Sequence, residues 1–277
     1  MHSKMTLGMG QMLVVPGQVD QNLDRAVGMI GEAKGLGCDI VVLPECCDVG
    51  WTNADARRLA ESIPGSRSER LAAMARKHRV AVVAGLTERA SECVYNTAVM
   101  IDTQGDIRIR HRKINELPVG HDIYDVGDRL QVARCELGAV AVNICADNFP
   151  SSLAIGHVLA RMGAQILLSP SAWAVPPGSD DPSYGSLWLD AYRQLTSLYD
   201  ITVVGVSCVG PIISGPWSGY HCIGASIAMG PGGDVLARGP YGAGQSALIP
   251  VPVALRPPIG RGTTFAAELS KRGYVGP

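Results

Sequence analysis

Three side chains that could act together in nucleophilic catalysis, Glu45, Lys113 and Cys145, each lie at or just beyond the end of a predicted strand. A cysteine thiol can attack a carbonyl carbon, a carboxylate can take up and return the proton, and an ammonium group can stabilise the oxyanion that forms. The carboxyl ends of buried strands are a usual place for functional side chains in α/β proteins. Taken singly, each residue has a plainer explanation: Cys145 as a small buried hydrophobic residue, and Glu45 and Lys113 as solvated loop residues.

The segment around Cys145 predicts a strand that turns sharply into a helix. Residues 138–144 are rich in β-forming side chains, and Pro150 and Ser151 open a pattern of apolar residues at helical spacing. We therefore expect Cys145 to be exposed at the edge of a sheet. At such a turn, backbone N–H groups and the positive end of the helix dipole would favour the thiolate and could hold an oxyanion.

Strand-like and helix-like segments alternate along the whole chain, which indicates an α/β fold. The predicted strands are 5–15, 39–43, 80–86, 95–102, 106–111, 138–144, 165–168, 201–207, 222–229, 234–238 and 246–251, and the predicted helices are 20–35, 54–62, 66–78, 151–162 and 184–198. No break in composition divides the 277 residues, so we expect one domain over 1–277. The tail 255–277 has several prolines and glycines, and we expect it to pack on a partner subunit.

The composition argues against several classes of partner. Lysine and arginine number 24 against 25 aspartates and glutamates, and no basic run is present, so neither nucleic acid nor an anionic membrane is expected. No uninterrupted apolar span of ~20 residues occurs, so we expect neither a membrane span nor a signal peptide. The eight cysteines are scattered without a CxxC pair or metal-ligand spacing, which favours a reduced cytoplasmic protein without a bound metal.

Three short motifs, taken in order, resemble those of the nitrilase, or carbon–nitrogen hydrolase, superfamily: Pro44-Glu45, Arg112-Lys113 and Ile144-Cys145-Ala146-Asp147. The similarity covers nearly the whole chain, because the flanking segments also resemble those of the family: 11–43, 159–164, 168–172, 224–228 and 231–237. The resemblance implies a four-layer αββα sandwich, a homo-oligomer of two or more subunits and a Glu-Lys-Cys triad. We expect no cofactor.

The same resemblance implies a role for each residue. Glu45 would be the general base and later the acid, and Cys145 the nucleophile that forms a thioester. Lys113 and the backbone N–H of Ala146 would hold the oxyanion.

Further candidate site residues are less sharply defined. The family often has a second glutamate after the lysine, and here Glu116 and Asp122 both stand near that place; either could hold the lysine charged and oriented. Trp173, like Trp51 and Trp217, could line the pocket, with ordinary packing as the equal alternative. Substrate choice is expected to depend on three loops: 48–54, 176–184 and 210–219.

The residues after Cys145 favour an amide substrate. True nitrilases tend to have Trp-Glu there, whereas this chain has Ala146-Asp147. The arginines with which carbamoyl-amino-acid hydrolases hold a carboxylate are missing from this segment, which argues against a small anionic substrate. We therefore expect a hydrolase of a small neutral or amine-bearing amide. The alternatives are an N-carbamoyl amine amidohydrolase, which would release carbon dioxide with ammonia, and a non-catalytic or acyl-transferring member of the superfamily.

Overall fold

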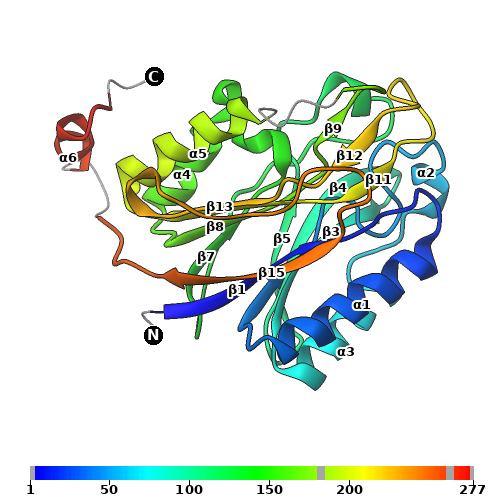
Figure 1. The fold of residues 1–277 in the computed structure, drawn as a ribbon, viewed down its shortest axis with the longest axis horizontal. Coiled ribbons are helices and arrows are strands. Elements are labelled where there is room, and N and C mark those ends of the chain that lie inside the picture. The colour runs from blue at the N-terminus through cyan, green and yellow to red at the C-terminus, as the bar shows by residue number, and fades with distance from the viewer. Residues whose placement is uncertain (1–3, 180–184, 260–264, 275–277) are drawn as a thin grey trace.

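Two six-stranded sheets lie face to face, and helices cover the outer side of each (Figure 1). The computed structural model describes residues 4–179, 185–259 and 265–274. The first sheet contains, in spatial order, β15 (Ala247–Ala254), β1 (Lys4–Gln11), β2 (Ile40–Val42), β3 (Ala81–Ala90), β4 (Cys93–Ile101) and β5 (Ile107–Arg112). The second contains β14 (Val235–Arg238), β13 (Ile227–Met229), β10 (Thr202–Ser207), β8 (Ile166–Ser171), β7 (Gly138–Val142) and β6 (Val132–Cys135).

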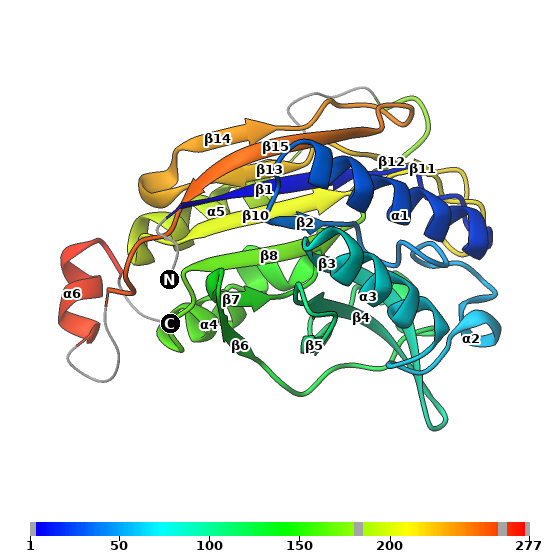
Figure 2. The same ribbon diagram turned by 90° about the horizontal axis from the view of Figure 1, so that it is seen from below.

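The outer layers consist of two pairs of helices. Helices α1 (Val19–Gly35) and α3 (Ser66–His78) cover the first sheet, and α4 (Ala154–Arg161) and α5 (Ser186–Tyr199) cover the second (Figure 2). The expected four-layer αββα sandwich is thereby confirmed. The smaller elements are β9 (Ala174–Val175), β11 (Val209–Pro211), β12 (His221–Ile223), α2 (Ala56–Leu59), α6 (Phe265–Lys271) and the 3-10 helices η1 (Pro118–Gly120), η2 (Cys145–Asn148), η3 (Pro150–Ser152) and η4 (Pro231–Gly233).

The sequence pattern explains which segments lie in the middle of the sandwich. All three residues of β2 are buried, and β2 runs parallel to both β1 and β3, as a continuous apolar run predicts for a strand covered on two faces. Helix α1 instead buries one stripe of side chains and leaves its other face in solvent. The buried stripe contains Leu23, Ala26, Ile30 and Ala33.

The topology brings three strand ends together between the sheets. Strands β7 and β8 are parallel neighbours in the second sheet, so their carboxyl ends lie at the same edge. In the first sheet, β2 and β5 end on the side that faces this edge, because the N–H of Glu45, just after β2, donates a hydrogen bond to the carbonyl of Ser171 at the end of β8 (3.3 Å). The fold thus places the segments after β2, β5 and β7 in one region.

The structure confirms some of the predicted elements and differs from others. The hairpin of β4 and β5 is confirmed, and α3 has the predicted bounds. The predicted helix 151–162 is found as α4, but it begins only at Ala154, because 3-10 turns occupy the segment directly after Cys145. Helix α2 covers four residues of the predicted 54–62, and the small sheet of β9, β11 and β12 was not predicted.

The described part of the tail contacts its own chain. Leu269 of α6 is fully buried, Arg272 pairs with Asp200 (3.1 Å), and the rings of Tyr274 and His157 lie 5.2 Å apart. Residues 260–264 and 275–277 lie outside the described part of the chain. Packing of the tail on a partner subunit stays a prediction.

No helix in the described ranges is long and apolar enough to cross a membrane.

Candidate active site

The backbone around Glu45 lies tightly against β3. The N–H of Gly85 donates to the carbonyl of Pro44 (3.0 Å), and the carbonyl of Gly85 accepts from the N–H of Cys47 (2.8 Å). A Cβ atom at position 85 would lie 2.5 Å from the Cα of Glu45, so the close approach requires glycine there. Glu45 is therefore held at the end of β2 with its carboxylate buried.

Lys113 directly follows β5, and its backbone is fixed on both sides. Its N–H donates to the carbonyl of Asn96 (2.9 Å), and its carbonyl accepts from the N–H of Gly127 (2.8 Å). The side chain is 1% exposed, and Nζ donates to Glu45 Oε1 (2.7 Å) and Glu116 Oε1 (3.2 Å). Burial opposes the charged form, but Glu116 and Glu45 outweigh it, so the pKa of Lys113 is raised well above its ordinary value. The group is an ammonium ion at neutral pH.

Cys145 has a backbone conformation that residues other than glycine rarely adopt, with φ of +42°. Its N–H donates to Ser169 Oγ (3.0 Å), which also accepts from Asn148 Nδ2 (2.9 Å). The side chains of Asn148 and Asn143 form two reciprocal hydrogen bonds (2.8 and 2.9 Å). These buried contacts hold the turn that presents the sulfur.

The thiol of Cys145 is buried and protonated. Its residue is 7% exposed, which corrects the expectation of an exposed thiol at a sheet edge. Only the four-residue η2 begins at Cys145, so the expected helix dipole is too small to favour the thiolate. Burial and then the charge of Glu45 raise the pKa of the thiol, and Lys113 lowers it by less. Attack by this sulfur therefore needs a base.

Glu45 has the properties of that base. Burial, the largest cause, raises its pKa; Lys113 opposes this effect and Glu116 adds to it. Glu45 lies close enough to Cys145 for its charge to raise the pKa of the thiol. Lys113 binds Oε1, whereas the buried Oε2 has no hydrogen-bond partner among the described residues. A carboxylate with a raised pKa and an unoccupied oxygen beside the thiol is suited to take up its proton.

The two candidates for a second carboxylate lie in different places. Glu116 is 6% exposed, contacts Lys113, and accepts a hydrogen bond from Asn96 Nδ2 at Oε2 (3.3 Å). Asp122 lies on the surface, where its backbone carbonyl accepts from Arg57 Nε (3.3 Å). The geometry therefore puts Glu116, and not Asp122, beside the lysine.

A buried aspartate connects the lysine segment to the cysteine turn. Asp147 accepts hydrogen bonds from His111 Nε2 (2.8 Å) and from the N–H groups of Ile114 (3.2 Å), Asn115 (2.8 Å) and Ile144 (3.0 Å). Burial alone would raise the pKa of Asp147, but these contacts outweigh it and hold the pKa below its usual range. Asp147 is thus an ionised residue that connects β5 and the segment after it to η2 through hydrogen bonds.

Of the remaining predicted site residues, Ala146 directly follows Cys145 and Trp173 packs in the core. The carbonyl of Ala146 accepts from Asn115 Nδ2 (2.7 Å) and Ser152 Oγ (2.6 Å), which fixes the backbone after Cys145. Its N–H as an oxyanion donor stays a prediction. Trp173 is buried and stacks on Trp188 with ring centroids 4.3 Å apart.

Of the other two predicted tryptophans, Trp51 lies near the lysine. Lys113 Nζ lies 5.3 Å from the ring centroid of Trp51, which packs edge-on against Trp217. The loops around these rings were expected to determine substrate choice. Residues 180–184 of the expected loop 176–184 lie outside the described residues.

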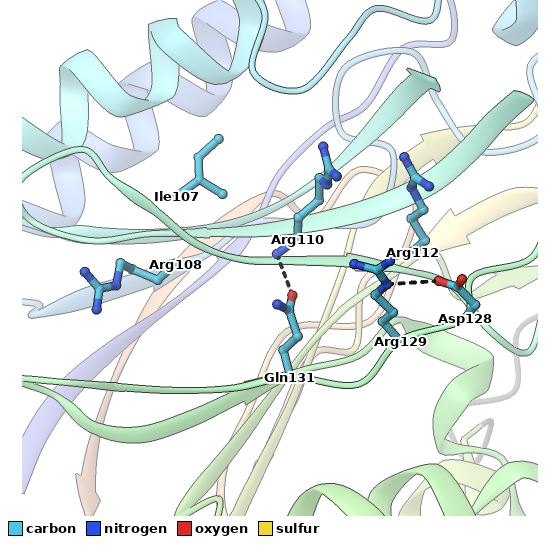
Figure 3. Close-up of a pocket in the computed structure, with 7 residues that line it drawn as sticks. All are labelled: Ile107, Arg108, Arg110, Arg112, Asp128, Arg129 and Gln131. Atoms are coloured by element: carbon cyan, nitrogen blue, oxygen red, sulfur yellow. Dashed lines mark hydrogen bonds and ion pairs between the residues drawn. The ribbon is translucent and has the colours of Figure 1, made fainter. Parts of the chain in front are cut away.

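A basic pocket of about 290 Å³ lies on the other side of β5 (Figure 3). Arg110 and Arg112 project side by side from this strand, and Arg112 forms two hydrogen bonds with the buried Glu88 (2.7 and 3.0 Å). The pocket is lined by Ile107, Arg108, Arg110, Arg112, Asp128, Arg129 and Gln131. Charged side chains of this kind protect the edge strand of a sheet from pairing with another chain.

Two residues of the site were missed in the sequence. Asn96 on β4 donates hydrogen bonds to both site carboxylates, and Ser169 on β8 accepts the N–H of Cys145. The available signal was a polar residue within an apolar series: Asn96 precedes the core residues Ala98 and Met100 at period two, and Ser169 follows a fully buried apolar run. Neither position has a catalytic residue type, so spacing alone does not single it out.

Comparison with known proteins gives consistent results. Residues 6–251 match the model of a family described as carbon-nitrogen hydrolase. The chain is 28% identical to the omega-amidase NIT2 of Xenopus tropicalis over 85% of this chain and 84% of that protein. It is 30% identical to a nitrilase of Pyrococcus abyssi over 79% of this chain and 78% of that protein. A mutant of the amidase from Nesterenkonia sp. AN1, solved after Michael addition of acrylamide at its active-site cysteine, superposes with a TM-score of 0.75 at 22% identity, covering 89% of this chain and 92% of that one.

Proposed function

This chain belongs to the carbon–nitrogen hydrolase family, and on that premise we propose that it hydrolyses the C–N bond of a small neutral or amine-bearing amide through a thioester on Cys145. The observation that carries the proposal is the buried 2.7 Å contact between Lys113 Nζ and Glu45 Oε1, near the Cys145 thiol whose pKa both residues affect. Three side chains that are far apart in sequence thus meet in one place.

In the first half of the reaction, the amide is converted to a thioester. Glu45 takes the proton of the Cys145 thiol as sulfur attacks the carbonyl carbon, and the electron pair of the C=O bond moves to oxygen. Lys113 and the N–H of Ala146 stabilise this oxyanion. When the tetrahedral intermediate collapses, the C–N bond breaks and the protonated Glu45 gives its proton to the leaving nitrogen.

In the second half, water releases the acid. Glu45, ionised again, takes a proton from water as its oxygen attacks the thioester carbon. Collapse of the second tetrahedral intermediate breaks the C–S bond, and the proton returns to sulfur. The cycle uses the same carboxylate twice, so its raised pKa serves both proton uptake and proton release.

Support for an amide substrate comes from two sources. The curated relative is an omega-amidase, and the related amidase of known structure forms an adduct with acrylamide at its cysteine. In this chain, Ala146 and Asp147 stand where true nitrilases tend to have Trp-Glu, and a carboxylate-binding arginine does not follow the cysteine.

The test is a screen of small amides, N-carbamoyl amines and nitriles for ammonia release by wild type, Cys145→Ala and Cys38→Ala. Cys38 is a matched control because it is also buried but lies in the cluster under α1. We expect amides to be hydrolysed by wild type and Cys38→Ala and not by Cys145→Ala. Ammonia release at the wild-type rate by Cys145→Ala would refute the mechanism. Carbon dioxide released together with ammonia would replace the amide assignment by the carbamoyl one.

A further inference from the structure

We propose that Asn96 is a positioning residue that fixes which oxygen of Glu45 exchanges the proton with Cys145 and with the leaving group. The inference rests on the proposed function, in which Glu45 is the base. Asn96 lies on β4 with 1% exposure.

Asn96 and Lys113 both bind the same oxygen of the base. Glu45 Oε1 accepts from Lys113 Nζ (2.7 Å) and from Asn96 Nδ2 (2.6 Å), so both of these short contacts are made to one atom. Oε2 is buried and has no hydrogen-bond partner in the part of the chain that the structure describes. A carboxylate anchored through one oxygen in this way can turn only about that anchor, which leaves the other oxygen to face the thiol.

The amide of Asn96 is itself held in one orientation. Its Oδ1 accepts from Cys46 Sγ (3.4 Å), and its Nδ2 has a second, longer contact with Glu116 Oε2 (3.3 Å). An amide has two N–H donors and one acceptor oxygen, and each of these has a partner here. A flipped amide would place its oxygen against two carboxylates, which is unfavourable. The orientation of Asn96 therefore follows from its neighbours.

This arrangement assigns separate tasks to the two oxygens. Oε1 stays bound to the ammonium and the amide throughout, and Oε2 receives the proton when the S–H bond breaks. The same proton leaves Oε2 for the nitrogen when the C–N bond breaks. Without Asn96, the carboxylate would keep only the lysine contact and could turn either oxygen toward the thiol. A smaller fraction of its orientations would then suit proton transfer from Cys145.

Several titratable groups lie around Glu45 or around its neighbour Cys46, and of these Lys113 and Glu116 shift the pKa of Glu45. They are Lys113 after β5, Glu116 in the following loop, Cys46 and Asp48 after β2, Tyr124 after η1, Cys145 on η2 and Cys208 after β10. The hydrogen bond from Asn96 lowers the pKa of Glu45. Its removal should therefore move the acid limb of the activity profile to higher pH.

The experiment compares Asn96→Ala and Asn96→Asp with Gln11→Ala. Gln11 is a matched control, because its fully buried amide also makes three hydrogen bonds, to Pro240, Gln245 and Ser226. Each variant is measured for unfolding temperature, for kcat/KM against pH, and for the pH dependence of iodoacetamide alkylation at Cys145 by peptide mass spectrometry. Glu45→Gln serves to assign the acid limb to Glu45.

For both Asn96 variants we expect kcat/KM to fall about 10- to 100-fold, the size expected for losing a hydrogen bond to a charged group. The acid limbs of hydrolysis and alkylation should move together to higher pH, further for Asn96→Asp, which adds a negative charge. Gln11→Ala should lower the unfolding temperature and leave both limbs in place.

Unchanged acid limbs in both Asn96 variants would overturn the proposal, as would an activity loss equal to that of Gln11→Ala at equal unfolding temperature. If wild type hydrolyses no amide, the proposed function fails. The pH dependence of alkylation at Cys145 then decides by itself whether Asn96 positions Glu45. A shifted alkylation limb would still support positioning of Glu45 by Asn96, and an unshifted one would refute it.

Discussion

Burial is the largest single influence on the pKa values of Glu45, Lys113 and Cys145, and among these three only at Lys113 do neighbouring charges outweigh it. It keeps the thiol protonated and raises the pKa of Glu45 toward the range in which a group can both accept and donate a proton. Lys113 stays charged only because Glu45 and Glu116 flank it. The site thus holds one ammonium between two carboxylates, with a neutral nucleophile beside them.

Replacement of Lys113 should remove stabilisation of the oxyanion. For Lys113→Met we expect kcat to fall by about 100- to 1000-fold, since one oxyanion donor contributes ~3–4 kcal/mol. The control is Lys34→Met, which removes an exposed lysine near the end of α1 and should leave kcat unchanged. Steady-state ammonia release measures both; equal kcat in the two variants would exclude Lys113 from the reaction.

The charge of Glu116 should affect the pH profile. Glu116 raises the pKa of Glu45, so Glu116→Gln should lower that pKa and move the acid limb of kcat/KM to lower pH. Glu45 acts in its ionised form, so the variant should keep a larger fraction of its own maximal activity in acid. Glu136→Gln, which removes an exposed glutamate, is the control. A limb that moves to higher pH would contradict the assigned charge interaction.

At the scale of elements, loops and turns position the catalytic groups and strands supply the fixed frame. Gly85 of β3 admits the backbone of Glu45, and Ser169 of β8 holds the N–H of Cys145. Asp147 ties β5 and the segment after it to η2 through three hydrogen bonds, and a fourth, from Ile144, lies within the cysteine turn. Distances among the triad therefore depend on contacts between elements that are remote in sequence.

Asp147→Asn should destabilise the protein and change its response to acid. Losing a hydrogen bond to a charged group costs ~1.5–3 kcal/mol, so we expect a loss of at least this size in the free energy of unfolding at neutral pH. Because the folded-state pKa of Asp147 is lowered, its contribution is full above the unfolded-state pKa and is lost as pH falls through the folded-state pKa. Urea unfolding across pH should show the variant and wild type converging in acid.

The matched control for this change is Asp24→Asn, which breaks an exposed ion pair with Arg70. It should change the unfolding free energy by less than ~1 kcal/mol. A wild-type advantage over Asp147→Asn that persists undiminished at the lowest pH would contradict the assigned role of the charge.

The order of elements was more predictable than the geometry of the site. Continuous apolar runs such as 39–43 and alternating ones such as 106–111 identify strands, because period and burial are local properties. A sharp turn at Cys145 was predicted, but its 3-10 geometry was not, since that geometry depends on Ser169 and Asn148. Asn96 gained its role only through the pairing of β3, β4 and β5. The choice between Glu116 and Asp122 likewise needed coordinates.

At the scale of the whole molecule, a surface beside the tail is suited to self-association. Val158 of α4 and Met162 just after it are 44% and 39% exposed, near His157, whose ring contacts that of Tyr274 after α6. Self-association and cytoplasmic location both stay predictions. Contiguous exposed apolar side chains commonly mark interfaces between subunits.

Val158→Glu should weaken any dimer formed through α4, because it places a charge in the contact. Sedimentation equilibrium should show wild type as a dimer or larger and the variant with a dissociation constant at least about tenfold higher. Val235→Glu, on the exposed face of β14, is the control and should match wild type. A monomeric wild type would exclude the predicted homo-oligomer, and equal association of all three proteins would exclude the α4 surface.

The central claim, that Cys145 forms a thioester under control of Glu45, is tested most directly by mass spectrometry of enzyme quenched during amide turnover. The account predicts an acyl mass increase on the peptide that carries Cys145 in wild type, and none at that peptide in Cys145→Ala or Glu45→Gln. Continued ammonia release with the Cys145 peptide unmodified, or an acyl group found on another residue, would contradict it.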